Sequence, residues 1–197
     1  MSGNDDLKYL YVTDVIYTCT HHTLYISDTI IQTRELDQVL AGLRLAGGDD
    51  ILELRINSGG GEVSIGQKII AAMAEGFQNR TITIMDAEAS SMAAMIFLAG
   101  DKRVIYEHSL CMLHNYSAGL FGKGGEIGDR YIATNDSMVA YAKQAVSPYL
   151  KKKEFKRILD GKDLYLDARQ MCSRGIATHI IVNGKEIEAG EYKNVKH

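Results

Sequence analysis

The sequence contains one proline and only three cysteines, and both scarcities exclude certain classes of protein. One proline in 197 residues, of which 46% are hydrophobic, does not fit a disordered or proline-rich chain. The cysteines Cys19, Cys111 and Cys172 are widely spaced and form no CxxC pair, which excludes the usual zinc and redox motifs. We expect them to be small buried side chains in a reducing compartment.

Long apolar runs and blocks of like charge are also missing. No stretch approaches the roughly 20 apolar residues that span a bilayer. The 22 basic and 25 acidic side chains are interspersed, so the formal net charge of -3 predicts no nucleic-acid groove. Residues 1–6 are polar and acidic, without the basic and apolar parts of a secretory signal. We therefore expect a cytoplasmic protein with neither a membrane nor a nucleic-acid partner.

The order of apolar patterns indicates one α/β domain. Residues 51–56 alternate apolar and charged side chains, as a strand with one wet face does, and the turn Asn57–Gly61 follows. Helical spacing from Val63 to Met73 and a further apolar strand at 81–85 complete a strand–helix–strand unit. Because this order repeats along the chain, we predict a largely parallel sheet with flanking helices.

A long helix is predicted in the second half of the chain. Asn115–Gly125 contains four glycines, and helical spacing then continues from Glu126 to Val146. At about 1.5 Å per residue this helix is about 30 Å long, so we expect it to project or to contact a partner. Pro148 is expected to open the next helix, since proline is tolerated in a first helical turn.

Two segments have backbone suited to binding an anion. Gly59-Gly60-Gly61 follow a strand, where glycines let the chain expose its N–H groups. Ser91-Met92 stand where a buried helix begins, so the Met92 N–H is an unpaired first-turn donor. Together they can form an oxyanion hole. Each signal alone is commonly just a turn or an N-cap, although Ser90 and Ser91 cannot both be caps.

A serine hydroxyl attacks a carbonyl only when a base removes its proton, and histidine has a suitable pKa. Four of the six histidines occupy polar or terminal positions where a surface location is expected: His21, His22, His179 and His197. His108 lies in a loop. His114 differs because it ends an apolar strand and opens the glycine-rich segment, and strand ends are where such sites are built. Taken alone, His114 is more commonly a structural histidine than a base.

A third group normally holds the imidazole in the required tautomer, and it is usually a carboxylate. Asp160, Asp163 and Asp167 cluster around residues 164–166. Residue types do not choose among the three aspartates.

At these segments the chain resembles the proteolytic subunit of Clp protease. Ile56–Gly61 is similar to the family's I-N-S-P-G-G turn, and Ala89–Ala94 to its A-A-S-M-G/A-A nucleophile segment. Leu110–His114 is similar to V-M-I-H, and Lys162–Ala168 to R-D-R/N-F-L-S-A. One such motif would be weak evidence for the family, but four motifs at matching spacing are strong evidence. The resemblance covers roughly residues 25–182.

The resemblance implies a serine endopeptidase with a Ser-His-Asp triad. The nucleophile falls on Ser91, the serine directly before Met92, the base on His114 and the triad aspartate on Asp163. The backbone N–H groups of Gly61 and Met92 would be the oxyanion donors. Neither a metal nor another cofactor is implied for this subunit.

The resemblance also implies a crotonase-like α/β domain at residues 24–182, between a divergent N-terminal segment (1–23) and a polar C-terminal tail (183–197). Family subunits form two stacked seven-membered rings, so a homo-oligomeric tetradecamer that cleaves peptides or unfolded proteins inside its chamber is expected. Residues 115–147 correspond to the handle that interleaves the rings. Its glycines suit a strand that presents peptide-binding backbone: Gly119, Gly122, Gly124 and Gly125.

The chain departs from the family pattern at several positions. Gly59 replaces the proline before the two glycines, and Tyr116 replaces a proline after the base. Glu53 and Arg55 stand where typical members carry tyrosines of the pocket that receives a loop of an AAA+ unfoldase. Charged side chains there disfavour an apolar loop, so a standard unfoldase is expected to dock poorly.

Two alternatives belong to other classes of protein. A crotonase-type acyl-CoA enzyme uses the same two-donor hole but does not need Ser91, His114 and Asp163 together. A non-catalytic ring subunit or assembly factor would keep the fold without the chemistry. The complete set of three residues argues against both. A specialised role, as in a phage-encoded or accessory protease acting in particle maturation, is a further hypothesis.

Overall fold

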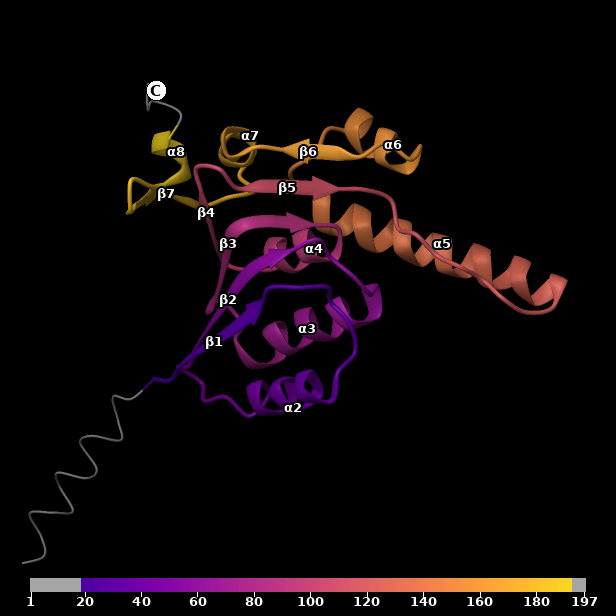
Figure 1. The fold of residues 1–197 in the computed structure, drawn as a ribbon, viewed down its shortest axis with the longest axis horizontal. Helices are drawn as coiled ribbons and strands as arrows, with labels where there is room; N and C mark the ends of the chain where they lie inside the picture. Colours follow the sequence, from indigo (N-terminus) through magenta and orange to yellow (C-terminus); the bar gives the residue numbers. More distant parts are fainter. Residues whose placement is uncertain (1–18, 193–197) are drawn as a thin grey trace, which may run out of the picture.

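A computed structural model describes residues 19–192 of the chain (Figure 1). Its strands are β1 (His21–Ile26), β2 (Ile51–Ser58), β3 (Thr81–Ser90), β4 (Lys102–Tyr106), β5 (Leu110–Leu113), β6 (Leu164–Leu166), β7 (His179–Val182) and β8 (Lys185–Glu188). Its helices are α2 (Arg34–Leu43), α3 (Val63–Gly76), α4 (Met92–Leu98), α5 (Gly124–Val146), α6 (Lys152–Leu159), α7 (Ala168–Ser173) and α8 (Ala189–Tyr192).

The strands form one sheet whose main path runs β1-β2-β3-β4-β7-β8, while β5 pairs with β3 and with β6. The β5–β6 and β7–β8 pairs are antiparallel, and the other pairs in the described residues are parallel. Helices α2, α3 and α4 lie together on one side of the sheet (Figure 1). The predicted α/β class with a largely parallel sheet is therefore confirmed.

The alternating pattern of β2 decides which face of the sheet is packed. Leu52, Leu54 and Ile56 are fully buried, whereas Glu53 and Arg55 between them stay partly exposed on the other face. Burying each large apolar side chain contributes about 1.5–3 kcal/mol. A slip of one residue would exchange the two sets and bury the charges, so the register of this central strand is strongly specified.

Strand β3 is longer than its apolar core predicts, and this extension leads to the candidate site. Its first half pairs with β4 from Ile82 to Met85, and its last residues, Glu88–Ser90, pair with β5 instead. The buried helix α4 begins two residues later at Met92. The helix N-terminus is thus placed at the end of β5.

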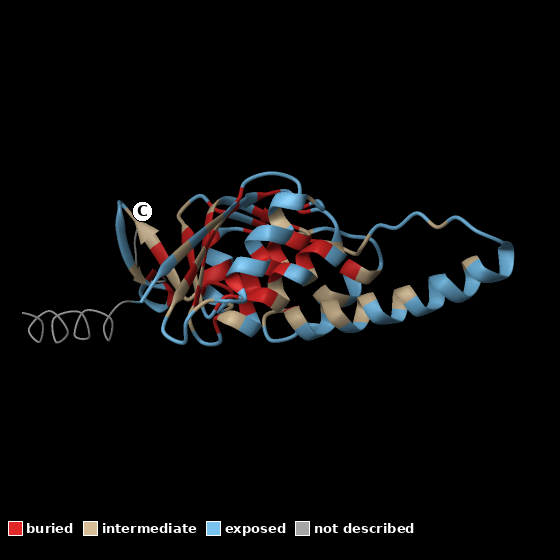
Figure 2. Cartoon of the chain, turned by 90° about the horizontal axis from the view of Figure 1, so that it is seen from below, coloured by how far each residue is buried: buried red, intermediate tan, exposed pale blue. Residues whose placement is uncertain are grey.

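Helix α5 and the segment before it project from the body of the domain (Figure 2). Its 23 residues correspond to about 34 Å, and within the helix only Val146 is buried. Large apolar side chains on this projection face solvent in the single chain, with Phe121 93% exposed, Ile132 59% and Tyr131 56%. The long helix predicted from the sequence is present and does project.

The structure differs from the sequence predictions at several elements. The predicted polar tail, residues 183–197, contains β8 and α8 within its described part, 183–192, and β8 forms an antiparallel hairpin with β7; residues 193–197 lie outside the described residues. Helix α6 begins at Lys152, so Pro148 lies in the turn before it. Cys111 and Cys172 are buried, as expected, but Cys19 is exposed. None of the helices between residues 19 and 192 is long and apolar enough to cross a membrane.

Candidate active site

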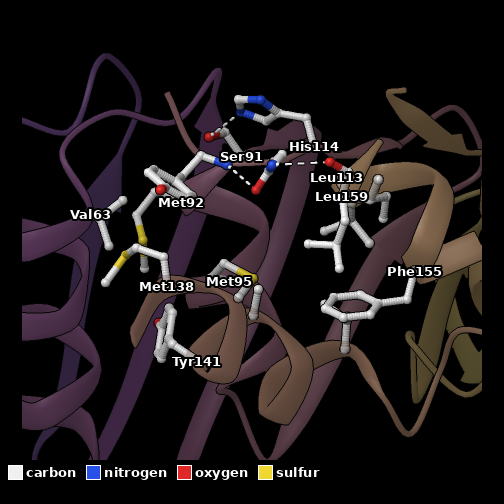
Figure 3. Close-up of a pocket in the computed structure, with 15 residues that line it drawn as sticks. Val63, Ser91, Met92, Met95, Leu113, His114, Met138, Tyr141, Phe155 and Leu159 are labelled. Atoms are coloured by element: carbon white, nitrogen blue, oxygen red, sulfur yellow. Dashed lines mark hydrogen bonds between the residues drawn. The ribbon is translucent and has the colours of Figure 1, made fainter. Parts of the chain in front are cut away.

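Ser91 and His114 are brought together by the parallel pairing of β3 with β5. Ser90 pairs with Met112, and the Ser91 N–H donates to the Met112 carbonyl oxygen at 2.9 Å. His114 follows two residues after Met112, at the end of β5. Its Nε2 atom lies 2.7 Å from Ser91 Oγ, a hydrogen bond across the top of the pocket in Figure 3.

The backbone at Ser91 makes a sharp strand-to-helix turn. Its φ of 56° and ψ of -123° are unusual for a residue with a side chain, and such conformations cost about 1–3 kcal/mol. Ser91 occupies the N-cap position of α4, yet its side chain makes no capping hydrogen bond. The hydroxyl is therefore free to face His114, as in the tight turns that expose a nucleophilic serine.

The neighbouring Ser90 has a different environment. Its side chain is buried, with 1% exposed, and its Oγ donates to Glu88 Oε1 at 2.5 Å. Successive side chains of a strand point to opposite faces, so Ser90 is directed away from His114. Of the two adjacent serines, the structure brings only Ser91 to the histidine.

The glycine turn after β2 packs directly against Ser91. A Cβ atom on Gly60, whose φ is +100°, would lie 2.7 Å from Ser91 Cβ and 3.1 Å from the Met92 nitrogen. A side chain is excluded at this position because it would clash with both. The glycine turn and the start of α4 therefore form one wall of the site.

Two backbone donors in this wall are unpaired within the described residues. Ile30 binds the residues on either side of Gly61, since its N–H donates to Gly60 O at 2.9 Å and its carbonyl accepts from Glu62 N–H at 2.8 Å. The Gly61 N–H takes no part in this pairing. The Met92 N–H belongs to the first turn of α4, where helical partners are missing. Of the two predicted oxyanion donors, Met92 N–H directly follows Ser91 in the chain, and Gly61 directly follows Gly60, which packs against Ser91.

Asp163 is exposed and makes no hydrogen bond or ion pair with another residue between 19 and 192. The antiparallel ladder of β5 and β6 nevertheless leads to it. The last pair of this ladder is Leu113 with Leu164, and the next residues along the two strands are His114 and Asp163. Residues that face each other across an antiparallel pair are near neighbours, so a continuation of this register beyond Leu113 and Leu164 would set Asp163 opposite His114.

The other two aspartates that the sequence left open have different partners. Asp160 accepts from Lys156 Nζ at 2.7 Å on an exposed turn of α6. Asp167 is the N-cap of α7 and accepts from the Gln170 N–H at 2.7 Å. The capping bond explains Asp167 as a structural residue.

An apolar pocket adjoins Ser91 (Figure 3). Its lining includes Met95 of α4, Met138 and Tyr141 of α5, and Phe155 and Leu159 of α6. Sequence analysis missed these residues as parts of a site. The helical spacing of α5 showed that Met138 and Tyr141 share a face, but only the packing of α5 shows what that face covers.

The handle glycines lie along the projection, in the segment before α5 and in its first turn (Figure 2). Gly119 and Gly122 lie in irregular backbone, whereas Gly124 and Gly125 begin the helix. The single chain therefore shows no strand at these four glycines, and their proposed pairing needs a second subunit.

Glu53 and Arg55 belong to a charged network on the open face of the sheet. Arg55 donates to Asp86 at 2.5 Å and to Glu53 and the Tyr106 hydroxyl at 3.3 Å each. Burial alone would lower the pKa of Arg55, but these bonds, above all that to Asp86, outweigh it and raise the pKa. His21 extends the network at 3.4 Å from Glu53. Glu53 and Arg55 are therefore held by polar partners on this face, and the expectation that an unfoldase loop docks poorly there stays a prediction.

No group of three or more histidine, cysteine or acidic side chains arranged to hold a metal ion occurs among residues 19–192.

The parallel pairing of β3 with β5 sets Ser91 and His114 in hydrogen-bond contact beside an apolar pocket, and the family comparison places the chain in a class of peptidases. The family described as Clp protease matches residues 7–184, so the chain belongs to the Clp protease family. The match begins at residue 7, inside the predicted divergent segment 1–23. Residues 1–18 of that segment lie outside the residues that the structure describes. A search of curated proteins gave no match.

Proposed function

We propose that this protein is a serine endopeptidase in which Ser91 is the nucleophile and His114 the general base. The main evidence for this proposal is the hydrogen bond between Ser91 Oγ and His114 Nε2, which are 2.7 Å apart. The free N–H groups of Gly61 and Met92 support it, because acyl transfer needs donors at the developing oxyanion. A crotonase-type enzyme has no need of a hydrogen-bonded serine and histidine.

The reaction follows from this geometry. His114 takes the Ser91 proton while Oγ attacks the peptide carbonyl carbon, and the oxyanion accepts from Gly61 and Met92 N–H groups. His114 then gives the proton to the leaving amine, which yields an acyl-enzyme and the first product. Water, deprotonated by His114, hydrolyses the ester and restores Ser91. Each oxyanion donor is worth about a hundred- to a thousandfold in rate.

Asp163 is proposed as the group that orients His114. The register of the β5–β6 ladder supports this assignment, since its continuation by one residue on each strand would pair His114 with Asp163. Catalytic hydrogen bonds are often long in a free enzyme and tighten when substrate binds. We propose that assembly or substrate binding brings the two side chains into contact.

Ring assembly is the proposed setting for this chemistry, with heptameric rings stacked around a chamber in the cytoplasm. Exposed Phe121, Tyr131 and Ile132 on the handle support an intersubunit contact, because large apolar groups gathered on a projection mark interaction sites. The charged network around Arg55 supports weak coupling to an unfoldase that inserts an apolar loop.

Substitution of Ser91 tests the proposed nucleophile. Ser91→Ala should abolish cleavage of a short fluorogenic peptide and labelling by a fluorophosphonate, because both need the hydroxyl. Ser90→Ala is the matched control and should keep labelling, since Ser90 faces Glu88. Labelling that survives in Ser91→Ala but disappears in Ser90→Ala would transfer the role to Ser90.

A further inference from the structure

The glycine turn that follows β2 is held by the segment that follows β1. Ile30 N–H donates to Gly60 O at 2.9 Å, and Ile30 O accepts the Glu62 N–H at 2.8 Å. A third bond comes from a side chain, since Ser58 Oγ donates to Asp28 O at 2.6 Å. Three hydrogen bonds therefore fasten the turn to this segment.

Ser58 also bonds to the turn itself. Its hydroxyl accepts the Gly60 N–H at 3.1 Å while it donates to Asp28 O. The side chain is buried, so a backbone group that lost this partner would be left unsatisfied. Ser58 pairs with Ala89 of β3, which lies two residues before Ser91. One hydroxyl thus joins the glycine turn to the segment after β1, at the end of β2 that adjoins the nucleophile candidate.

The hydrogen bonds of Gly60 determine the direction of the Gly61 N–H. The peptide bond between these two glycines is trans, since no cis peptide bond occurs in the described part of the chain. In a planar trans peptide the carbonyl oxygen and the N–H point in opposite directions. Because Ile30 holds the Gly60 oxygen, the Gly61 N–H is directed away from Ile30. Ser58 holds the Gly60 N–H, so the peptide planes on both sides of Gly60 are fixed.

The turn has little stiffness apart from these bonds. Proline, which the family pattern has at position 59, would fix one backbone angle of the turn, whereas Gly59 leaves it free. A Cβ atom at Gly59 would meet no atom within 4 Å other than those of its chain neighbours, so packing does not require glycine there. The orientation of the turn therefore depends on its hydrogen bonds.

We propose that Ser58 is a positioning residue for the peptidase reaction, whose hydroxyl holds the glycine turn so that the Gly61 N–H can serve as an oxyanion donor. This inference rests on the proposed peptidase function. Both partners of Ser58 Oγ are backbone groups, so the hydroxyl acts through the turn and not on the substrate. A donor that is already oriented stabilises the developing charge most effectively. Without the hydroxyl the turn can move, and the donor is aligned for only part of the time.

Ser58→Ala tests this role through separate values of kcat and KM. An oxyanion donor acts in the transition state, so kcat should fall about ten- to a hundredfold while KM stays within about twofold of wild type. Ser58→Thr keeps the hydroxyl and should recover most of the lost kcat. Ser58→Cys keeps the size of the side chain but donates weakly, so its kcat should lie between the two. It replaces Ser58→Ala in the test if that variant does not fold.

Ser109→Ala is the matched control, because Ser109 is bonded in the same way. Its buried hydroxyl accepts the Tyr106 N–H at 2.9 Å and donates to Met85 O at 3.0 Å. Ser109 directly precedes β5, at the opposite end of the strand from His114. This variant should lose thermal stability as Ser58→Ala does, but it should keep the wild-type kcat. An equal loss of kcat in both variants would reveal a general effect of stability and would overturn the proposal.

Hydrogen exchange of the full chain, followed by mass spectrometry, separates this inference from the proposed function. Peptides that span residues 57–62 report on the turn without any catalysis. Their exchange should become faster in Ser58→Ala, which frees the Gly60 N–H, and should stay unchanged in Ser109→Ala. If wild type cleaves no peptide but exchange changes in this way, the hold of Ser58 on the turn is supported and the peptidase proposal falls. Unchanged exchange in Ser58→Ala overturns the positioning role, whatever the activity.

Discussion

Ser91 has a positive φ, a strained backbone conformation that persists only because the surrounding residues stabilise it. The glycine turn leaves room for it only because Gly60 has no side chain, and the Ser91 N–H is fastened to β5 through Met112. The same packing places the Met92 N–H next to the hydroxyl. The strained backbone of Ser91 and the close approach of Gly60 therefore belong to the same packing, and this packing exposes Ser91 Oγ to His114.

Asp163 offers the sharpest residue-scale prediction. Asp163→Asn should lower kcat/KM by about a hundred- to ten-thousandfold, because an amide favours the wrong tautomer of His114. Peptidase kinetics under saturating and limiting substrate would measure the loss.

Asp160→Asn is the matched control for that experiment. It changes a nearby aspartate whose partner is Lys156, and it should leave the rate unchanged. Equal activity of Asp163→Asn and wild type would remove Asp163 from the proposed triad.

Helices α6 and α7 flank the short strand β6, and an ion pair holds them together. Arg174 donates to both carboxylate oxygens of Glu154, at 2.9 and 2.8 Å, and both side chains are about four-fifths buried. The bond to Arg174 lowers the pKa of Glu154 to about 2, against the opposing effect of burial, and the Lys151 N–H assists. This clamp supports the segment that carries Asp163.

The clamp predicts an acid-dependent stability. Because the folded-state pKa of Glu154 lies below its unfolded value, its stabilising effect is complete above the unfolded pKa and is lost as pH falls through about 2. Glu154→Gln should therefore lower the melting temperature near neutral pH, with a difference from wild type that shrinks in acid. Thermal unfolding followed by circular dichroism across pH measures this.

Glu75→Gln provides the comparison, since Glu75 pairs with Arg44 but is more than half exposed. Exposed pairs contribute about 0–1 kcal/mol, so this variant should unfold almost as wild type does. A constant difference between Glu154→Gln and wild type at every pH would contradict the assigned pKa.

The whole molecule is an α/β body from which the handle, residues 115–147, projects, and most of the handle helix α5 is not buried in the single chain. Only Val146 of α5 is buried, although the helix spans about 34 Å. Apolar side chains that face solvent along such a helix are stabilised when a second copy covers them. This exposed projection is the surface on which the proposed ring assembly is expected to depend.

Ile132→Asp should disrupt that assembly. A charge on the exposed handle has little effect on the folding of one subunit but costs free energy when a neighbour buries it. Native mass spectrometry should show a smaller oligomer, with an unchanged melting temperature for the dissociated subunit.

Leu45→Asp is the control at the opposite side of the domain, where Leu45 is 86% exposed after α2. It should assemble like wild type. If Ile132→Asp has the same oligomeric mass as wild type, the handle is not the contact.

Much of the fold was predictable because the patterns are local. Alternation in β2 and helical spacing in α3 and α5 reflect side chains a few residues apart. The misses were short or polar elements. β6 has three residues, and β8 alternates charged residues around Ile187, so neither carries the apolar pattern of a buried strand.

For this protein the sequence alone determined the α/β class, the order of the main elements and four motifs that resemble Clp protease. Residue types alone did not choose between Ser90 and Ser91, although the motif resemblance placed the nucleophile on Ser91, and nothing in the sequence marked Tyr141 as part of a site. The hydrogen bond of Ser91 and the lining of the pocket depend on contacts between distant segments, as His114 reaches Ser91 across 23 residues of sequence. Only the pairing of β3 with β5 and the packing of α5 bring such groups together, because burial and hydrogen-bond geometry are properties of the folded chain.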